Sequence, residues 1–322
     1  MKTRIATEFV PGLKLSELFY REALSPILGS NFPKTRYSAG LLGSGSEVLG
    51  LDTIRSTDHH WGPRLQIFLS EDDHRTQAKL IDEALSKQLP LQFHGYSTNF
   101  GPPDQIGIRL IKNIESGPVS HLVEITTIPS FFENYLGIDP DLELKVGDWL
   151  TIPEQRLLSV TKGRVFHDGL GKLNRVRQGL SYYPKDVWLY LLAAQWASIA
   201  QEEAFIGRTG EVGNELGSRI IAARLVRALM KLCFLMERQY APYSKWFGAA
   251  FARLTCSKRL ASIFANVLRA ESWPERERYL SRAYSHVAKM HNALSITEPL
   301  DTNVSPYYNG PYQVIHSERF AK

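Results

Sequence analysis

The sequence GSGS at residues 43–46 is the first segment whose residue types could do chemistry. Glycine lets a backbone approach a ligand closely, while serine hydroxyls and backbone N–H groups bind phosphate oxygens. Asp58 and His60 follow, ahead of an apolar run at residues 64–69 that predicts a buried strand. Because side chains alternate across a strand, we expect Asp58 and His60 to project from one face. This order of elements suits chemistry on a nucleotide phosphate.

Several blocks along the chain resemble one bacterial protein family. They read GSGSEVLG, DHHWGPR, PEQRLL, YYPKDVWLY, QEEAFIGR and YAPYSKW, and they run from about residue 43 to residue 246. These blocks are similar to the nucleotidyltransferase-like proteins known by the domain name DUF4037. The nucleotidyltransferase superfamily carries a hydrophobic-Gly-Ser turn, then about ten residues, then Asp-x-Asp or Asp-x-Glu. Ser46 and Asp58 fit that spacing.

The resemblance implies transfer of a nucleotidyl group from a nucleoside triphosphate, with ATP as the leading candidate. Such in-line displacement at a phosphate needs metal ions, and Mg²⁺ or Mn²⁺ prefers carboxylate oxygens. Asp58 matches the first acid of the superfamily. We expect Glu124, in the apolar run LVEIT, to be the third acid, because a lone acid there is costly without a metal or a cation beside it. The triphosphate would bind the turn, formed by Gly43, Ser44, Gly45 and Ser46.

His60 stands where the superfamily has its second acid. Imidazole suits zinc, manganese, iron or nickel better than magnesium, so this residue changes the expected metal site. Three interpretations stay open. The site has an altered metal preference or a single metal; His60 is a general base or a phosphate contact; or the chain is a folded relative that has lost catalysis. We include His60 with Asp58 and Glu124 as a candidate catalytic and metal-binding residue.

The second half of the chain holds further candidates, which the resemblance supplies. Helical domains of similar transferases hold phosphates with basic residues, and Arg208 and Lys245 are the matching candidates here. In the similar aminoglycoside nucleotidyltransferases an acid of that domain activates the acceptor hydroxyl. Glu203, in the block QEEAF, is the candidate for that role, although paired glutamates on helices more often lie in solvent.

Periodicity predicts an α+β fold with two domains. A nucleotidyltransferase-like α/β domain is expected over residues 1–155, with a mixed sheet and helices, and an α-helical domain with a tail over residues 156–322. In the first domain we expect strands at 37–42, 64–69, 91–97 and 121–127, helices at 13–28 and 72–88, and a short helix through Glu47 and Val48. In the second we expect helices at 184–205, 215–238, 243–254, 258–270 and 274–294, then a surface tail from 296.

The length and composition of the chain limit the classes of protein to which it can belong. With 322 residues and 43% hydrophobic content, the chain is long enough to bury sizeable cores. Its two cysteines form no zinc-binding pattern, and no uninterrupted apolar run reaches the roughly 18 residues of a membrane span. We therefore expect a cytoplasmic protein without a membrane partner. A formal charge of +5 leaves a polyanionic partner open.

The sequence thus predicts a metal-dependent nucleotidyltransferase that acts on an unidentified hydroxyl-bearing small molecule. The rival prediction is a catalytically inactive nucleotide-binding or interaction protein that keeps the fold. RNA is a further candidate acceptor, because the chain is basic and rich in Trp and Tyr. The acceptor, the base preference and the oligomeric state stay open.

Overall fold

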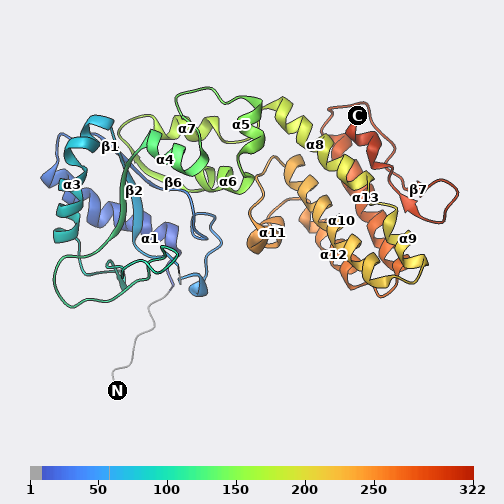
Figure 1. Cartoon of the computed structure of the whole chain (residues 1–322), viewed down its shortest axis with the longest axis horizontal. Coiled ribbons are helices and arrows are strands. Elements are labelled where there is room, and N and C mark those ends of the chain that lie inside the picture. The colour runs from blue at the N-terminus through green and yellow to red at the C-terminus, as the bar shows by residue number, and fades with distance from the viewer. Residues whose placement is uncertain (1–8, 58) are drawn as a thin grey trace, which may run out of the picture. The chain divides into compact units, whose positions relative to one another are not determined.

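The computed structural model describes residues 9–57 and 59–322 of the chain, which form two compact units (Figure 1). Unit 1 is Met1–Ser181 and unit 2 is Tyr182–Lys322. Unit 1 contains a mixed sheet with helices and unit 2 is mostly helical, so the predicted α+β fold is confirmed. The division falls after Ser181, beyond the boundary expected near residue 155, because a strand at residues 164–168 belongs to the sheet of unit 1.

The main sheet of unit 1 has the strand order β5-β2-β1-β6. Its strands are β1 (Tyr37–Leu41), β2 (Arg64–Leu69), β5 (Leu122–Thr127) and β6 (Arg164–Asp168). β1 runs antiparallel to β2 and β6, while β2 runs parallel to β5. Strands β1, β2 and β5 confirm the strands predicted at residues 37–42, 64–69 and 121–127. The sequence did not predict β6, whose alternation is weak and which pairs with a strand far away in the chain.

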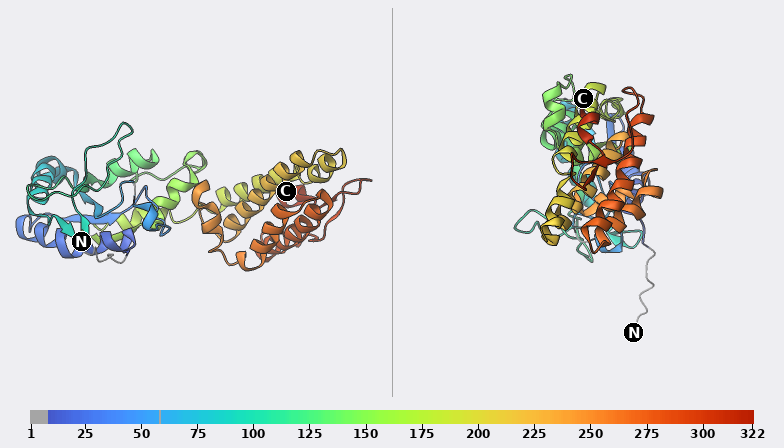
Figure 2. Two further views of the ribbon diagram at one scale, coloured as in Figure 1. Left: turned by 90° about the horizontal axis from the view of Figure 1, so that it is seen from below. Right: turned by 90° about the vertical axis from the view of Figure 1, so that its right-hand side faces the viewer.

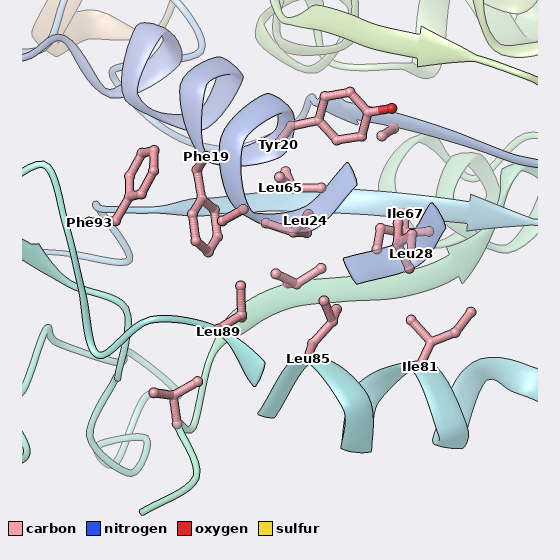
Figure 3. Packing of buried hydrophobic residues seen from close by; sticks show 14 of the residues in the cluster. Phe19, Tyr20, Leu24, Leu28, Leu65, Ile67, Ile81, Leu85, Leu89 and Phe93 are labelled. Carbon is pink, nitrogen blue, oxygen red and sulfur yellow. The ribbon is translucent and has the colours of Figure 1, made fainter. Parts of the chain in front are cut away.

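One face of the sheet carries the core of unit 1. The predicted helix at 13–28 is a continuous helical run of α1 (Gly12–Phe19), a π-helical turn η1 (Tyr20–Leu24) and α2 (Ser25–Asn31). It packs with α3 (Glu71–Gln88) on the apolar side of β2 (Figure 3). The shared contacts are made by buried side chains from all these elements, among them Phe19, Tyr20, Leu24, Leu28, Leu65, Ile67, Ile81, Leu85, Leu89 and Phe93.

The opposite face of the sheet contacts α4 (Ile128–Leu136), which follows β5, and α7 (Leu173–Gly179) packs against β6. The other helices of this part of unit 1 are α5 (Val146–Thr151) and α6 (Glu154–Lys162). Phe68 projects to this side and meets the ring of Phe131 in α4 edge to face, with 5.4 Å between centroids. This face is the one on which the polar residues of β2 and β5 lie.

A hairpin replaces the single strand expected at 91–97. β3 (Gln92–Phe93) and β4 (Tyr96–Ser97) pair antiparallel across His94 and Gly95. Both turn residues have left-handed backbones, with φ of 48° and 84°. The prediction of one strand was wrong, because the glycine allows the chain to reverse there.

Unit 2 is built from helices, several of which lie side by side (Figure 2). The longest of them, α10, begins after Asn214, which is its N-cap: the Asn214 side chain accepts the N–H of Gly217 at 2.9 Å. The five predicted helices of this half are confirmed, with ends shifted by a few residues, and α9 is a further helix that the sequence did not predict. The helices are α8 (Lys185–Ala200), α9 (Phe205–Glu211), α10 (Glu215–Met236), α11 (Ser244–Phe251), α12 (Ser257–Arg269) and α13 (Trp273–Ala293).

The C-terminal segment is part of the core of unit 2. It contains β7 (Ser305–Pro306), β8 (Gln313–Val314) and the 3-10 helix η3 (Ser317–Ala321). Phe320 is buried and stacks on Trp196 of α8, with 4.5 Å between ring centroids. The expectation of a tail laid over the surface was therefore wrong for its last residues.

Within the described residues, no helix combines the length and the apolarity needed to cross a membrane.

Candidate functional site

The GSGS turn leaves β1 on a tightly constrained backbone. Gly43 and Gly45 have φ of 85° and 143°, a region that favours glycine. A Cβ atom on Gly45 would lie 2.6 Å from the guanidinium of Arg64 and from the carboxylate of Glu47. Ser44 is exposed and Ser46 is half-buried. The turn thus presents a serine side chain and backbone groups at the end of the central strands.

An ion pair lies under this turn and holds it. Arg64 Nε donates to Glu47 Oε1 at 2.9 Å, and Arg64 Nη2 donates to the same oxygen and, at 2.6 Å, to the carbonyl of Ser44. The Arg64 and Glu47 side chains are only 12% and 4% exposed, so water screens the pair weakly. One arginine therefore fixes both ends of the turn.

Two more contacts fix the strand end that leads into the turn. The side chain of Gln66 accepts the N–H of Leu42 at 3.0 Å and donates to the Leu42 carbonyl at 3.2 Å. The N–H of Gly43 donates to the carbonyl of Ser159 in α6 at 3.2 Å. The turn is positioned by β2 on one side and by α6 on the other.

The short helix expected through Glu47 and Val48 is absent from the described structure. Residues 46–50 form turns, and the next helical element is the 3-10 helix η2 (Ile54–Ser56). The prediction of a short helix directly after the GSGS turn was therefore wrong. Asp52 caps α1, because its Oδ2 accepts the first N–H of that helix, from Gly12, at 2.7 Å, and it also accepts the Trp61 indole N–H at 3.0 Å.

Glu124 lies on β5 in register with Gln66 of β2, on the sheet face opposite the apolar core. It is exposed, and within the described part of the chain no hydrogen bond or ion pair holds its carboxylate. We expected Glu124 to need a metal because it would be buried, and that reason was wrong. Its position beside a buried glutamine near the GSGS turn remains compatible with a ligand-binding role.

Asp58 lies outside the described residues, so of Asp58 and His60 the structure describes only His60. His60 has a left-handed backbone with φ of 47°, and its N–H donates to the carbonyl of Arg109 at 3.2 Å. It precedes β2, which begins at Arg64, so the expected strand alternation fails at His60. Burial and the neighbouring charge of Arg64 lower the pKa of His60, which favours the neutral imidazole at physiological pH.

Among residues 9–57 and 59–322, no three or more His, Cys, Asp and Glu side chains gather as a metal site would require. The residue beside Glu124 on β2 is Gln66, not a second acid, and its side-chain amide is already hydrogen-bonded to the backbone of Leu42. The described residues alone therefore do not assemble a two-metal centre. A metal at this edge of the sheet would need a donor from outside them, and Asp58 is the candidate.

Two residues that we did not predict lie next to the turn. The Tyr135 hydroxyl of α4 is 3.4 Å from Ser44 Oγ, and the Tyr135 ring lies against Gly43. The exposed guanidinium of Arg156 lies over that ring, 5.8 Å from its centroid, and donates to the Tyr135 carbonyl at 3.0 Å. Their only sequence signal was the block PEQRLL, which contains Arg156.

The candidates in unit 2 are not gathered in one place. Arg208 lies in α9, which comes just before α10, with its guanidinium over the Phe205 ring. Lys245 lies over the Trp246 ring in α11, which follows the other end of α10. α10 has 22 residues and so spans roughly 33 Å. Arg208 and Lys245 therefore do not form one phosphate cluster.

Glu203 is buried and holds the C-terminal segment. Its carboxylate accepts the N–H groups of Ile315 and Ser317, both at 3.0 Å. Burial raises the pKa of Glu203 to about 7 despite these bonds. The contacts account for this acid as a structural anchor, and a role as general base is not needed to explain its burial.

Part of the chain matches a known protein family. No curated protein matches the chain. Residues 149–247 match a family model described as a domain of unknown function, DUF4037, which extends from α5 of unit 1 to α11 of unit 2 and leaves the GSGS turn outside the matched segment. That description names no activity, and it supports the family resemblance for this segment of the chain.

Proposed function

We propose that unit 1 binds a nucleoside triphosphate, with ATP the leading candidate, at the GSGS turn and transfers its nucleotidyl group to a hydroxyl-bearing small molecule. One observation carries the proposal. The turn between β1 and β2 is held by the buried Arg64–Glu47 pair, while the Ser44 side chain is exposed. A fixed turn that exposes a serine side chain suits phosphate oxygens.

In this proposal, different residues around the turn bind the phosphates and the metal ion. The hydroxyls of Ser44 and Ser46 and the N–H groups of residues 44–46 would donate to the phosphates, since the N–H of Gly43 is bonded to Ser159. Arg156 is an exposed cation next to Tyr135, which itself contacts Ser44, so it would balance charge on the outer phosphates. Asp58 and Glu124 would hold Mg²⁺ or Mn²⁺, whose contribution is to neutralise charge on the reacting phosphate.

A second candidate function is nucleotide binding without transfer. The neighbour of Glu124 on β2 is Gln66, and its amide is bonded to the backbone of Leu42. A two-metal site needs a cluster of acids, so this amide favours a binding or interaction role. Both functions use the same turn, and they differ in whether a product forms.

Titration calorimetry tests the binding step that both functions share. ATP should bind the wild-type chain saturably in the presence of Mg²⁺ or Mn²⁺. Asp58→Ala should abolish the metal-dependent part of the affinity, and Glu124→Gln should weaken it. Glu133→Gln, which changes an exposed acid of α4, is the matched control and should bind like wild type. Equal affinity for wild type and Asp58→Ala would contradict the metal role.

A transfer assay separates the two functions. Labelled ATP is incubated with the chain, with either metal, and with a panel of small hydroxyl compounds, protein and RNA. A labelled small-molecule product that Asp58→Ala fails to form supports transfer. Labelled RNA alone would identify RNA as the acceptor. Saturable binding without any labelled product would favour the non-catalytic function.

A further inference from the structure

The only two cysteines of the chain, Cys233 and Cys256, lie together in unit 2. Cys233 is fully buried in the last turns of α10. Cys256 is partly exposed and is the N-cap residue of α12. Their thiols are hydrogen-bonded to one another. The fold therefore joins two thiols that are far apart in the sequence.

Glu237 fixes the backbones that carry these thiols. Its own N–H donates to the carbonyl of Cys233 at 3.0 Å. Its carboxylate accepts the N–H of Cys256 at 2.8 Å through Oε1 and that of Thr255 at 2.8 Å through Oε2. One side chain thus links the end of α10 to the start of α12, so the contact between the thiols is part of a defined packing arrangement.

We propose that Cys233 and Cys256 are a redox modification site that forms a reversible intramolecular disulfide when a hydroperoxide oxidises the protein. The Cys256 thiolate attacks hydrogen peroxide, which breaks the O–O bond, gives a sulfenic acid and releases hydroxide. The Cys233 sulfur then attacks the Cys256 sulfur, forms the S–S bond and releases water. In sum, two thiols lose two electrons and two protons, and one peroxide becomes two waters.

The surroundings of the two thiols assign these roles. Cys256 is the more accessible of the two thiols, because it is partly exposed at the N-cap of α12 whereas Cys233 is fully buried in α10, so a peroxide reaches Cys256 first. The hydrogen bond to Cys256 and burial hold the pKa of Cys233 well above its usual range. Cys233 therefore stays a thiol until Cys256 has been oxidised, and it acts as the resolving residue.

The disulfide would close a loop that contains α11 (Ser244–Phe251). Phe247 and Phe251 of this helix already pack on Phe234, next to Cys233. A crosslink across a loop of this size removes freedom from the unfolded chain, so the oxidised protein should melt higher by roughly 5 °C or more.

The test is intact-mass measurement on the folded full-length chain. Wild type treated with stoichiometric hydrogen peroxide should lose the mass of two hydrogens, become resistant to alkylation, melt at a higher temperature, and return to its original mass with dithiothreitol. Cys256→Ser should show none of these changes, and because Cys256 is partly exposed this variant should fold. Cys233→Ala, if folded, should stop at the sulfenic acid of Cys256, which a dimedone probe would label.

Three outcomes would overturn the inference. The first is that oxidation of folded wild type accumulates sulfenic or sulfinic acid at Cys256 while Cys233 can still be alkylated after unfolding. The second is a disulfide that forms only between chains, visible as a dimer on a non-reducing gel. The third is a disulfide that forms in urea but not in the folded chain.

Discussion

The side-chain amide of Gln66 completes the hydrogen bonding of Leu42, accepting its N–H at 3.0 Å and donating to its carbonyl at 3.2 Å. Gln66 is 5% exposed, so these bonds lie out of water. The amide therefore extends the hydrogen bonding between β1 and β2 by one residue, to Leu42, which directly precedes the GSGS turn. The position of the proposed phosphate site therefore depends on one buried side chain of β2.

Gln66→Leu should destabilise unit 1 and weaken ATP binding. Leucine fills similar space but leaves the N–H and the carbonyl of Leu42 without partners, at a cost of roughly 1–3 kcal/mol. Urea unfolding followed by circular dichroism measures the loss. Gln178→Leu, at an exposed position of α7, is the matched control and should change stability little. Equal losses for the two variants would contradict the role of Gln66.

Arg64→Lys should weaken ATP binding more than it destabilises the fold. Lysine keeps the charge beside Glu47 but cannot also reach the Ser44 carbonyl in the fork geometry of arginine. We expect the Kd for ATP to rise roughly tenfold, which is about 1.4 kcal/mol. Arg55→Lys, on the exposed 3-10 helix η2, should leave the Kd unchanged. An unchanged Kd in Arg64→Lys would show that this arginine does not position the site.

Glu203 should make the stability of unit 2 depend on pH. Its pKa in the folded chain is about 7, against 4.5 as the ordinary value, because of burial and, to a smaller extent, the charge of Glu318. The folded state therefore binds this proton more tightly than the unfolded state does. The free energy of unfolding should fall as pH rises from about 4.5 to 7, by on the order of 3 kcal/mol.

The comparison with Glu203→Gln isolates this effect from other titrating groups. Glutamine cannot ionise, and its amide can accept only one of the N–H groups of Ile315 and Ser317. The stability advantage of wild type over the variant should be greater at pH 5 than at pH 8, as measured by urea unfolding. A difference that stays constant across this range would mean that the carboxyl titrates near its ordinary pKa.

Phe320→Ala should strongly destabilise unit 2, although Phe320 is only two residues before Lys322. The ring is 4% exposed and stacks on the fully buried Trp196. Truncation of a buried phenylalanine costs about 3–5 kcal/mol. Tyr308→Ala provides the matched control in the same segment, since Tyr308 is 83% exposed. Thermal melting should separate the two variants by many degrees, and similar melting temperatures would place Phe320 outside the core.

Local patterns predicted the elements whose signals are contained in their own residues. α3 begins after Ser70, whose hydroxyl accepts the N–H of Asp73, and carries three acids in its first turn and a lysine in its last. All residues of β2 except Arg64 and Gln66 are apolar. Helix-cap and burial signals of this kind do not depend on partners elsewhere in the chain.

Elements defined by distant partners could not be predicted in this way. β6 is recognisable as a strand only through its pairing with β1. The C-terminal segment is recognisable as part of the core only through its contacts with Glu203 and Trp196. The same reason explains the candidate site. Spacing indicated the GSGS turn, whereas Gln66, Tyr135 and Arg156 reach it from separate elements. The exposure of Glu124 depends on the helices that cover the sheet, which its own strand does not reveal.

Hydrogen exchange of the backbone N–H groups at residues 44–46, with and without ATP and Mg²⁺, tests the central claim most directly. Phosphates bound at the turn would accept bonds from these groups, so their exchange should slow several-fold when ATP is present, and Arg64→Lys should reduce the effect. If ATP binds and protects other segments while residues 44–46 exchange at an unchanged rate, the GSGS turn is not the phosphate site.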